Sequence, residues 1–459
     1  MNANNLKKNN LTLRYSFHQI AYWAAIGGVV TFAAAYLLGR GFTAAQTGRI
    51  LCAADFFSFI FQPLLASAAD RAKKNIIPLL MFLLSLGSIL CFAVIRFTAV
   101  PFFAFCVLYA AGVLMLDMQV PLLNSVSVYY TSRSWLLNYG LGRGMGGFGY
   151  ALATLGYGYI MDRFGNGIMP LAAICLIIIY AVIGITYPSA DSSACAEALS
   201  GDSAKSGNKT GPTGGAALTN KAGSAGDAAL TNKAGSAGDA DLTNKAALPD
   251  TSEAASVQKK AEAEASTLPE FILRNKWYCL SLFGVLFLAA FHVMIENFLI
   301  EILDRLGGGS SEVGIALFVA TLTELPAMMS FAAVHKKLGS FRLFMISGVS
   351  FIFKSVLLIF AGSVGAVYAI QILQVVTYVP LSTIQMFYAN ECISGADMVK
   401  GQSVITAFYT LGCAAGNLLG GSLISASGVS ALLLAGVVLT CAGTAVLFFT
   451  VPRALKTGR

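Results

Sequence analysis

The stretch WLLNYGLGRGMGGFGYALATLGYGYIM, residues 135–161, indicates the fold class of this chain. It is apolar, rich in glycine and longer than the roughly 20 residues that a helix needs to cross the hydrocarbon core of a bilayer. Arg143 lies about a third of the way along it. An arginine facing lipid there would cost roughly 2.5–3.5 kcal/mol or more. We therefore expect a transmembrane helix in the wall of a polar cavity, in a protein that moves a solute across a membrane.

Two other interpretations of this stretch are open. Gly142, Gly144 and Gly147 have the spacing of a dinucleotide-binding fingerprint. That motif requires a preceding strand and a βαβ unit, where this sequence has only apolar helix. Alternatively, Arg143 lies nearer the lipid headgroups and extends its charged end toward them.

The composition indicates a membrane protein with several spans. It is 56% hydrophobic and 11% charged, whereas soluble domains carry about 25% charged residues. The net charge of +8 does not indicate a nucleic-acid partner, because the basic residues fall mainly between apolar runs. Cysteines without CxxC spacing and three scattered histidines predict neither a disulfide framework nor a metal site. The first apolar run is long enough to be the first span rather than a signal peptide.

Apolar runs long enough to span a bilayer form two groups of six. They are residues 15–38, 50–69, 76–95, 99–121, 135–161 and 168–187, and then 277–300, 313–333, 342–362, 365–388, 402–424 and 428–450. We predict an all-α membrane protein with twelve transmembrane helices in two six-helix halves around a central cavity. The predicted halves are residues 1–188 and 271–459, with residues 189–270 as a linker.

The linker and the loop charges predict the orientation of the chain. Residues 189–270 are mostly Ala, Gly, Ser, Thr, Asp and Lys, with AALTNK, AALTNK and ADLTNK in register. Such a segment buries too little apolar surface to offset its ordering entropy, so we expect a disordered tether; a docking segment is the alternative. Most basic loop residues, among them Lys7, Lys8, Arg274 and Lys276, fall on one side of the spans. The positive-inside rule then predicts a multi-pass cell-membrane protein with both termini and the linker in the cytoplasm.

The turn after the second apolar run reads Ala66-x-x-x-Asp70-Arg71-Ala72-Lys73-Lys74. A similar basic turn, SFAAVHKKLGSFRLFMI, follows the eighth run, which suggests two halves of duplicated architecture. The first turn resembles the loop signature of the major facilitator superfamily. The resemblance implies a transporter fold, in which Asp70, Arg71, Lys73 and Lys74 would form a gate that latches one half against the other. A plain turn that only sets the topology is the alternative.

Further stretches resemble the lactose permease branch of that superfamily, whose members transport oligosaccharides, nucleosides and phenylpropionate with protons. They are Phe61-Gln62-Pro63-Leu64 and Tyr139-Gly140-Leu141-Gly142-Arg143, the latter leading to Gly149-Tyr150-Ala151-Leu152. The resemblance implies that Arg143 binds the substrate and that Tyr150 stacks on it. Asn124 falls near the position of an acidic sugar-binding residue in that branch.

The second half resembles the same branch less closely. Glu324 matches a glutamate of helix 8, and Lys354 falls where the branch has an arginine on helix 9. His292 and Glu296 fall near two aspartate positions of helix 7. Tyr378 stands where the branch has its proton-carrying glutamate, and Gly412 stands where it has a lysine.

Few ionisable residues lie inside the predicted spans, and these are the candidates for coupling and binding. Glu324 and Lys354 are near the middles of consecutive spans, where a pair can stay charged and an unpaired group tends to become neutral. We expect Glu324 to be the main protonatable group, assisted by His292 or Glu296; a static ion pair is the alternative. Asp55 and Asp117 either pair with Arg143, line the substrate cavity or form local hydrogen bonds. Asp117 and Asn124 are spaced to share one helix face.

The leading functional hypothesis is a secondary active transporter that takes up a polar organic solute with protons by alternating access, with a sugar or nucleoside favoured. The alternatives are a drug or metabolite exporter of the same superfamily and a membrane sensor or scaffold that transports nothing. An enzyme is not expected, because the sequence has no P-loop, metal cluster or nucleophile–base motif. The expected partners are a small-molecule substrate, protons and the lipid bilayer. We expect no cofactor and a monomeric protein.

Overall fold

The computed structural model of the chain describes residues 3–71, 76–131, 133, 135–188, 266–393 and 397–457, without the side chains of residues 3–10, 66–71, 268 and 399. Helices make up almost all of these residues, and none of them is in a strand. Eight helical segments are long and apolar enough to cross a membrane. The all-α membrane fold expected from the sequence is therefore confirmed, while the number of twelve spans stays a prediction.

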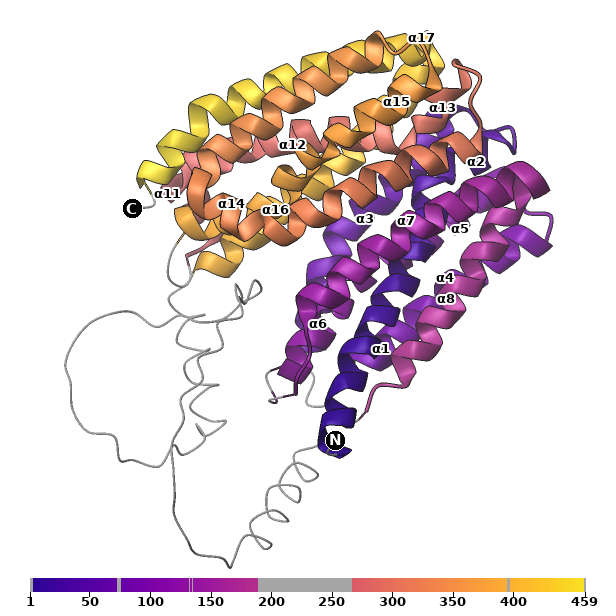
Figure 1. Cartoon of the computed structure of the whole chain (residues 1–459), viewed down its shortest axis with the longest axis horizontal. Helices are drawn as coiled ribbons and strands as arrows, with labels where there is room; N and C mark the ends of the chain where they lie inside the picture. Colours follow the sequence, from indigo (N-terminus) through magenta and orange to yellow (C-terminus); the bar gives the residue numbers. More distant parts are fainter. Residues whose placement is uncertain are drawn as a thin grey trace, which may run out of the picture.

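The helices before residue 189 form one set in space (Figure 1), which we call the first set. It contains α1 (Ala3–Ile26), η1 (Gly27–Thr31), α2 (Ala33–Leu38), α3 (Ala44–Arg71), α4 (Ile77–Phe97), α5 (Phe102–Asp117), α6 (Gln119–Thr131), α7 (Tyr139–Phe164), η2 (Asn166–Ile168) and α8 (Met169–Ile185).

The helices after residue 265 form the second set. It contains α11 (Leu268–Arg274), α12 (Lys276–Asn297), α13 (Leu299–Asp304), α14 (Ser310–Ile359), α15 (Val364–Gln371), η3 (Ile372–Val375), α16 (Tyr378–Cys392) and α17 (Met398–Thr457). Both ends of the chain lie at the same end of the bundle (Figure 1), which we call the terminal end; the opposite end is the far end.

Two glycines divide the longest helices of the second set. α14 has 50 residues and α17 has 60, about twice what a single crossing needs. Gly339 in α14 and Gly428 in α17 have φ values of 73° and 78°, which side chains other than glycine rarely adopt. Each of these helices is therefore two helices joined at a tight reversal, as the separate apolar runs 313–333 and 342–362, and 402–424 and 428–450, predicted.

The fourth apolar run extends ten residues further than predicted. We expected it to end at residue 121, but α6 continues to Thr131. The hydroxyls in this extension form hydrogen bonds within the helix itself: Ser125 Oγ donates to Pro121 O at 2.8 Å, and Thr131 Oγ1 donates to Ser127 O at 2.8 Å. Asn124 therefore lies on a helix, but Met118 separates it from the helix that carries Asp117.

Two interruptions of regular helix lie within the apolar segments. The π-helical turn η1 joins α1 to α2, and the 3₁₀ turn η3 joins α15 to α16. A hydroxyl from a neighbouring helix reaches the backbone at each place: Tyr109 donates to Val29 O at 2.8 Å, and Ser347 donates to Thr377 O at 2.6 Å. Irregular backbone at membrane depth requires such internal partners.

Glycines allow the two sets to touch backbone to backbone. α7 packs on α14 and α3 packs on α17. A Cβ at Gly158 would lie 2.4 Å from Ser310 O, and one at Gly421 would lie 2.2 Å from Ala44 O. These contacts are near the far end, where the two sets approach each other; their ribbons diverge toward the terminal end (Figure 1).

Two Gly→Ala changes, one at a tightly packed glycine and one at an unpacked glycine, should distinguish the effect of packing on stability from that of helix propensity. A Cβ at Gly416 of α17 would lie 2.3 Å from Ala290 O of α12, whereas one at Gly156 of α7 would meet nothing within 4 Å. Each Gly→Ala change should stabilise its helix by roughly 1 kcal/mol through the higher helix propensity of alanine. At Gly416, however, overpacking against α12 costs about 1–3 kcal/mol. We expect Gly416→Ala to lower the melting temperature of the purified protein in detergent and Gly156→Ala to leave it unchanged or raise it. An equal effect of the two changes would contradict this packing.

Candidate functional site

A hydrogen-bonded chain crosses between the two sets at the middle of the bundle. Tyr150 of α7 donates its phenol proton to Glu296 Oε1 of α12 at 2.9 Å. The other carboxylate oxygen, Oε2, lies 2.9 Å from Nε2 of His292, one turn earlier on α12. On the first-set side, the Thr31 hydroxyl lies 2.9 Å from the Tyr150 hydroxyl. The carboxylate of Glu296 is thus held by partners from both sets.

The position of Thr31 follows from the interruption of the first span. Thr31 is the last residue of η1 and is buried. Gly27, at the start of the same turn, lets α7 approach closely, because a Cβ there would lie 3.5 Å from the Tyr150 ring. The irregular turn therefore brings a hydroxyl to the point where α7 meets α12.

A second cluster lies within the second set and contains both predicted mid-span charges. Lys354 Nζ donates to Gln374 Oε1 at 2.5 Å, and Glu324 lies close enough for its charge to interact with Lys354. All three side chains are buried: Lys354 is 2% exposed, Glu324 7% and Gln374 3%. Lys354 and Glu324 do not form a direct ion pair among the described residues.

The interruption η3 positions this cluster beside the first one. Gln374 lies in η3, and Tyr378 begins the helix that follows. The Tyr378 ring stacks on His292, with centroids 4.2 Å apart and planes inclined by 19°. Tyr378 therefore contacts the histidine that pairs with Glu296.

Arg143 lies over an aromatic ring rather than beside a carboxylate. Its guanidinium carbon is 4.2 Å from the centre of the Trp23 ring, a cation–π distance. The Trp23 indole donates to Gln19 Oε1 at 3.0 Å, and Gln19 Nε2 donates to the Tyr15 hydroxyl at 2.7 Å. Neither Asp55 nor Asp117 forms an ion pair with Arg143 among the described residues.

Asp55 instead belongs to a second contact between the sets. Asn417 Nδ2 of α17 donates to Asp55 Oδ2 of α3 at 2.8 Å, and Asn297 Nδ2 of α12 donates to Asn417 Oδ1 at 2.8 Å. Asp117 is near enough to Asp55 for the charges of the two carboxyl groups to interact. The backbone carbonyl of Asp117 accepts a hydrogen bond from the Gln62 side chain. Asn124 lies on α6, where its backbone carbonyl accepts a hydrogen bond from the Ser127 hydroxyl.

The structure thus brings some of the predicted residues together and adds partners that sequence reasoning missed. His292, Glu296 and Tyr150 meet directly. Trp23, Thr31, Gln374 and Asn417 were not among the predicted residues, although Gln374 and Asn417 are polar residues in apolar runs, which is a usable signal. The predicted gate residues Asp70, Arg71, Lys73 and Lys74 lie outside the described side chains.

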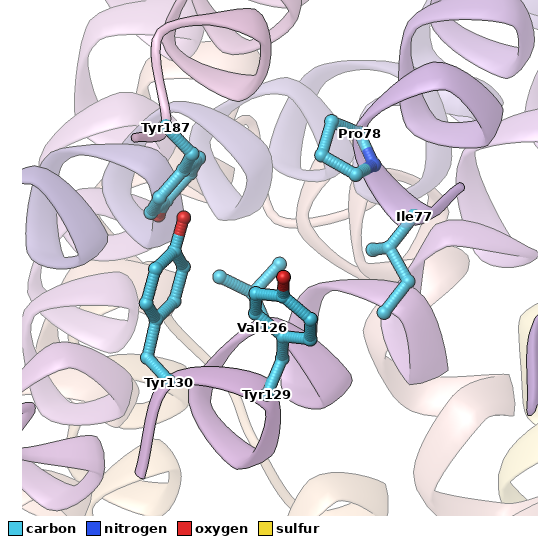
Figure 2. Close-up of a pocket in the computed structure, with 6 residues that line it drawn as sticks. All are labelled: Ile77, Pro78, Val126, Tyr129, Tyr130 and Tyr187. Carbon is cyan, nitrogen blue, oxygen red and sulfur yellow. The ribbon is translucent and has the colours of Figure 1, made fainter. Parts of the chain in front are cut away.

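Two cavities lie apart from these clusters. One at the terminal end of the first set has a volume of about 10 Å³, at the lower limit for a single water. Its walls are Ile77, Pro78, Val126, Tyr129, Tyr130 and Tyr187 (Figure 2). The other, of about 330 Å³, lies at the far end and is lined by Arg40, Phe42 and loop residues 98–100 among others. None of the predicted binding or coupling residues lines either cavity.

The central clusters contain several ionisable groups. Glu296 lies between a phenol and a histidine, and Lys354 and Glu324 lie nearby. A carboxylate in such surroundings can change its protonation when its partners move. The partners of Glu296 come from both sets, so its surroundings depend on how the sets are arranged.

Solved structures with the same arrangement are transporters. Two structures of the nucleoside transporter NupG, one of them a mutant, match with TM-scores of 0.68 and 0.67 at 12% and 13% identity, each covering 97% of this chain and 99% of the other. A bacterial homolog of the human lysosomal transporter Spinster, in an inward-facing and unoccupied conformation, matches with a TM-score of 0.62 at 14% identity, covering 98% of both chains. At these identities the likeness shows the fold alone. No curated protein matches the sequence.

The family comparison identifies the chain. The model of the MFS_1 like family matches residues 12–435, which cover most of both sets of helices. The expected resemblance to the major facilitator superfamily is therefore confirmed, and with it a multi-pass membrane transporter rather than an enzyme. The chain belongs to the MFS_1 like family of major facilitator transporters.

Proposed function

We propose that this chain is a proton-coupled symporter that carries a polar organic solute by alternating access. The observation that carries the proposal is the central hydrogen-bonded chain, in which Tyr150 of one set holds the Glu296 carboxylate of the other at 2.9 Å. A proton added to Glu296 changes a contact that exists only while the sets are in this arrangement. Binding and conformation are then linked, which is what coupled transport requires.

Glu324 is the main protonatable group in this proposal, and Glu296 and His292 assist it. Glu324 is buried, and its charge interacts with that of Lys354, which donates to Gln374. A carboxylate in such surroundings becomes neutral when its cationic partner is elsewhere and ionised when that partner returns. The nearby Glu296–His292 pair supplies a second proton-binding position.

Arg143 is the proposed substrate anchor, with Asn124, Asp117, Asp55 and Tyr150 as further contacts. Its guanidinium carbon rests on Trp23 and it forms no ion pair among the described residues, so its donors are free of a fixed carboxylate. An arginine beside aromatic rings offers hydrogen bonds to hydroxyl and carbonyl oxygens and apolar faces to a ring. Sugars and nucleosides both have such groups, and nucleosides are tested first because a nucleoside transporter shares the fold.

The proposed orientation places the terminal end, the linker and both chain ends in the cytoplasm. It follows from the basic residues at that end. The described hydrogen bonds between the sets are at the middle and the far end. In this orientation the structure corresponds to a state closed on the outer side.

The proton role of Glu324 is tested by Glu324→Gln, which keeps the shape of the side chain but cannot ionise. Purified protein in proteoliposomes is assayed with adenosine and uridine, and then with sugars if neither is transported. We expect proton uptake driven by the substrate to fall by about tenfold or more, while exchange of labelled for unlabelled substrate continues. Asp304→Asn, at an exposed position, is the control. Unchanged proton uptake in Glu324→Gln would rule out the assignment.

The binding role of Arg143 is tested by Arg143→Ala. Hydrogen bonds to a charged donor contribute about 1.5–3 kcal/mol, so we expect binding to weaken by about 10- to 150-fold. The measurement is the rise in melting temperature when a screen of nucleosides, sugars and aromatic acids is added, since a ligand stabilises the form that it binds. Arg96→Ala, an exposed arginine at the end of α4, should respond as the parent protein does. Equal stabilisation of both variants by the same compound would remove Arg143 from the site.

A further inference from the structure

At the far end, a carboxylate of the first set caps a helix of the second set. Asp162 lies in the last turn of α7. Its Oδ1 accepts a hydrogen bond from Ser310 N at 3.1 Å, and its Oδ2 accepts one from Ser311 N at 2.8 Å. Ser310 and Ser311 are the first two residues of α14. Both oxygens of Asp162 are therefore bound to the start of a helix that belongs to the other set.

This helix cannot cap itself in the usual way. The residue before its first turn is Gly309, which has no side chain to accept from the free N–H groups that every helix start leaves. Glu312 accepts from Gly309 N at 2.6 Å, which leaves the next two N–H groups for Asp162. A Cβ at Gly309 would lie 3.4 Å from Asp162 Oδ1, so the glycine also leaves room for the carboxylate.

The other contact at the far end is built differently. Ala45 N, near the start of α3, donates to Ser425 Oγ of α17 at 2.8 Å. α3 also has its own cap, in which Gln46 N donates to Thr43 Oγ1 at 3.2 Å and Thr43 N donates to Gln46 Oε1 at 2.8 Å. Ser425 therefore adds one neutral hydrogen bond to a helix that is already capped. Asp162 supplies a charged acceptor to a helix that has none at these two positions.

Close backbone packing surrounds the Asp162 contact. Gly158, one turn before Asp162, touches Ser310 O, and Gly314, one turn into α14, touches Thr154 O; a Cβ at either would lie within 2.6 Å of that oxygen. The two helices thus meet without side chains between them, and Asp162 closes the end of this contact. Separation of the sets at the far end must break both of its hydrogen bonds.

The contact is also easy to reverse, because Asp162 is exposed. When it separates from α14, its carboxylate is hydrated, and no buried charge is left without a partner. A capping interaction of this kind changes an equilibrium by about tenfold. That is enough to favour one arrangement and small enough to be lost in each cycle.

We propose that Asp162 is a positioning residue for transport, which holds the far end closed by capping α14 of the opposite set and must release it before that end can open. The inference rests on the proposed alternating access, but not on the identity of the substrate or on the coupling ion. It differs from the gate predicted at Asp70, which belongs to the terminal end.

The test measures the separation of the sets directly. Spin labels are placed at Phe103 in the first set and Phe360 in the second, both at the far end and 77% and 78% exposed, in a cysteine-free background. Pulsed electron paramagnetic resonance on the full chain in lipid nanodiscs gives the distance distribution. We expect Asp162→Ala to raise the ratio of far-end-open to far-end-closed protein by about tenfold. Asp162→Asn, which keeps one acceptor oxygen but loses the charge, should lie between Asp162→Ala and the parent protein.

Glu312→Ala is the matched control. It removes a carboxylate from the same helix start, but that carboxylate belongs to the second set itself. Both alanine variants should therefore lower the melting temperature, and only Asp162→Ala should lengthen the distance between labels. An identical distance distribution in Asp162→Ala and the parent protein, or an equal shift in Glu312→Ala, would overturn the proposal.

A second variant covers the case in which Asp162→Ala does not fold. Gly158→Ala leaves Asp162 in place but presses on Ser310 O, and it should also shift the distribution toward the open far end. These distances need no substrate. A chain that transports none of the probes yet shows the shift would contradict the proposed function alone, and a chain that transports normally without the shift would contradict the Asp162 proposal alone.

Discussion

A polar group that faces the hydrocarbon core of a membrane needs a hydrogen-bond partner within the protein, because that core holds no water to supply one. At the centre of the bundle that partner often comes from the opposite set of helices. Glu296 depends on Tyr150, and Asp55 depends on Asn417. The charged groups are therefore satisfied in one arrangement of the sets and need new partners in any other. A proton or a substrate can serve as that new partner, which makes the same residues suited to coupling and to binding.

The two places where the sets meet have different chemistry. At the centre, the contacts are between side chains, and two of the groups can change their charge. At the far end, the side chains of Asp162 and Ser425 accept from backbone N–H groups at helix starts, and glycines pack against carbonyl oxygens. The central contacts can respond to pH and ligand, whereas those at the far end respond mainly to geometry. In the proposed alternating access, both kinds of contact have to change when the sets separate at that end.

The apolar runs predicted the all-helical membrane fold, because the requirement to pair every backbone group leaves few alternatives at that hydrophobicity. The same runs made Glu296, His292, Glu324 and Lys354 candidates, since a charge at such a depth needs a partner. The partners themselves could not be predicted. Gln374, which accepts from Lys354, lies in η3, where its helix is interrupted, and no period in the sequence indicates that interruption. Trp23 was missed because an aromatic residue in an apolar helix is ordinary.

The hydroxyls of Tyr109 and Ser347 have a consequence for how freely this chain can vary. Each bonds to a carbonyl at an interruption of regular helix, in the place that solvent would take in a water-soluble protein. Loss of either oxygen would leave a bare carbonyl in an oily interior, at a cost of several kcal/mol. In the part of the chain that the structure describes, neither hydroxyl is hydrogen-bonded to a predicted binding residue, yet both satisfy the main chain where it departs from regular geometry near the candidate site. We therefore expect selection to tolerate little exchange at either position.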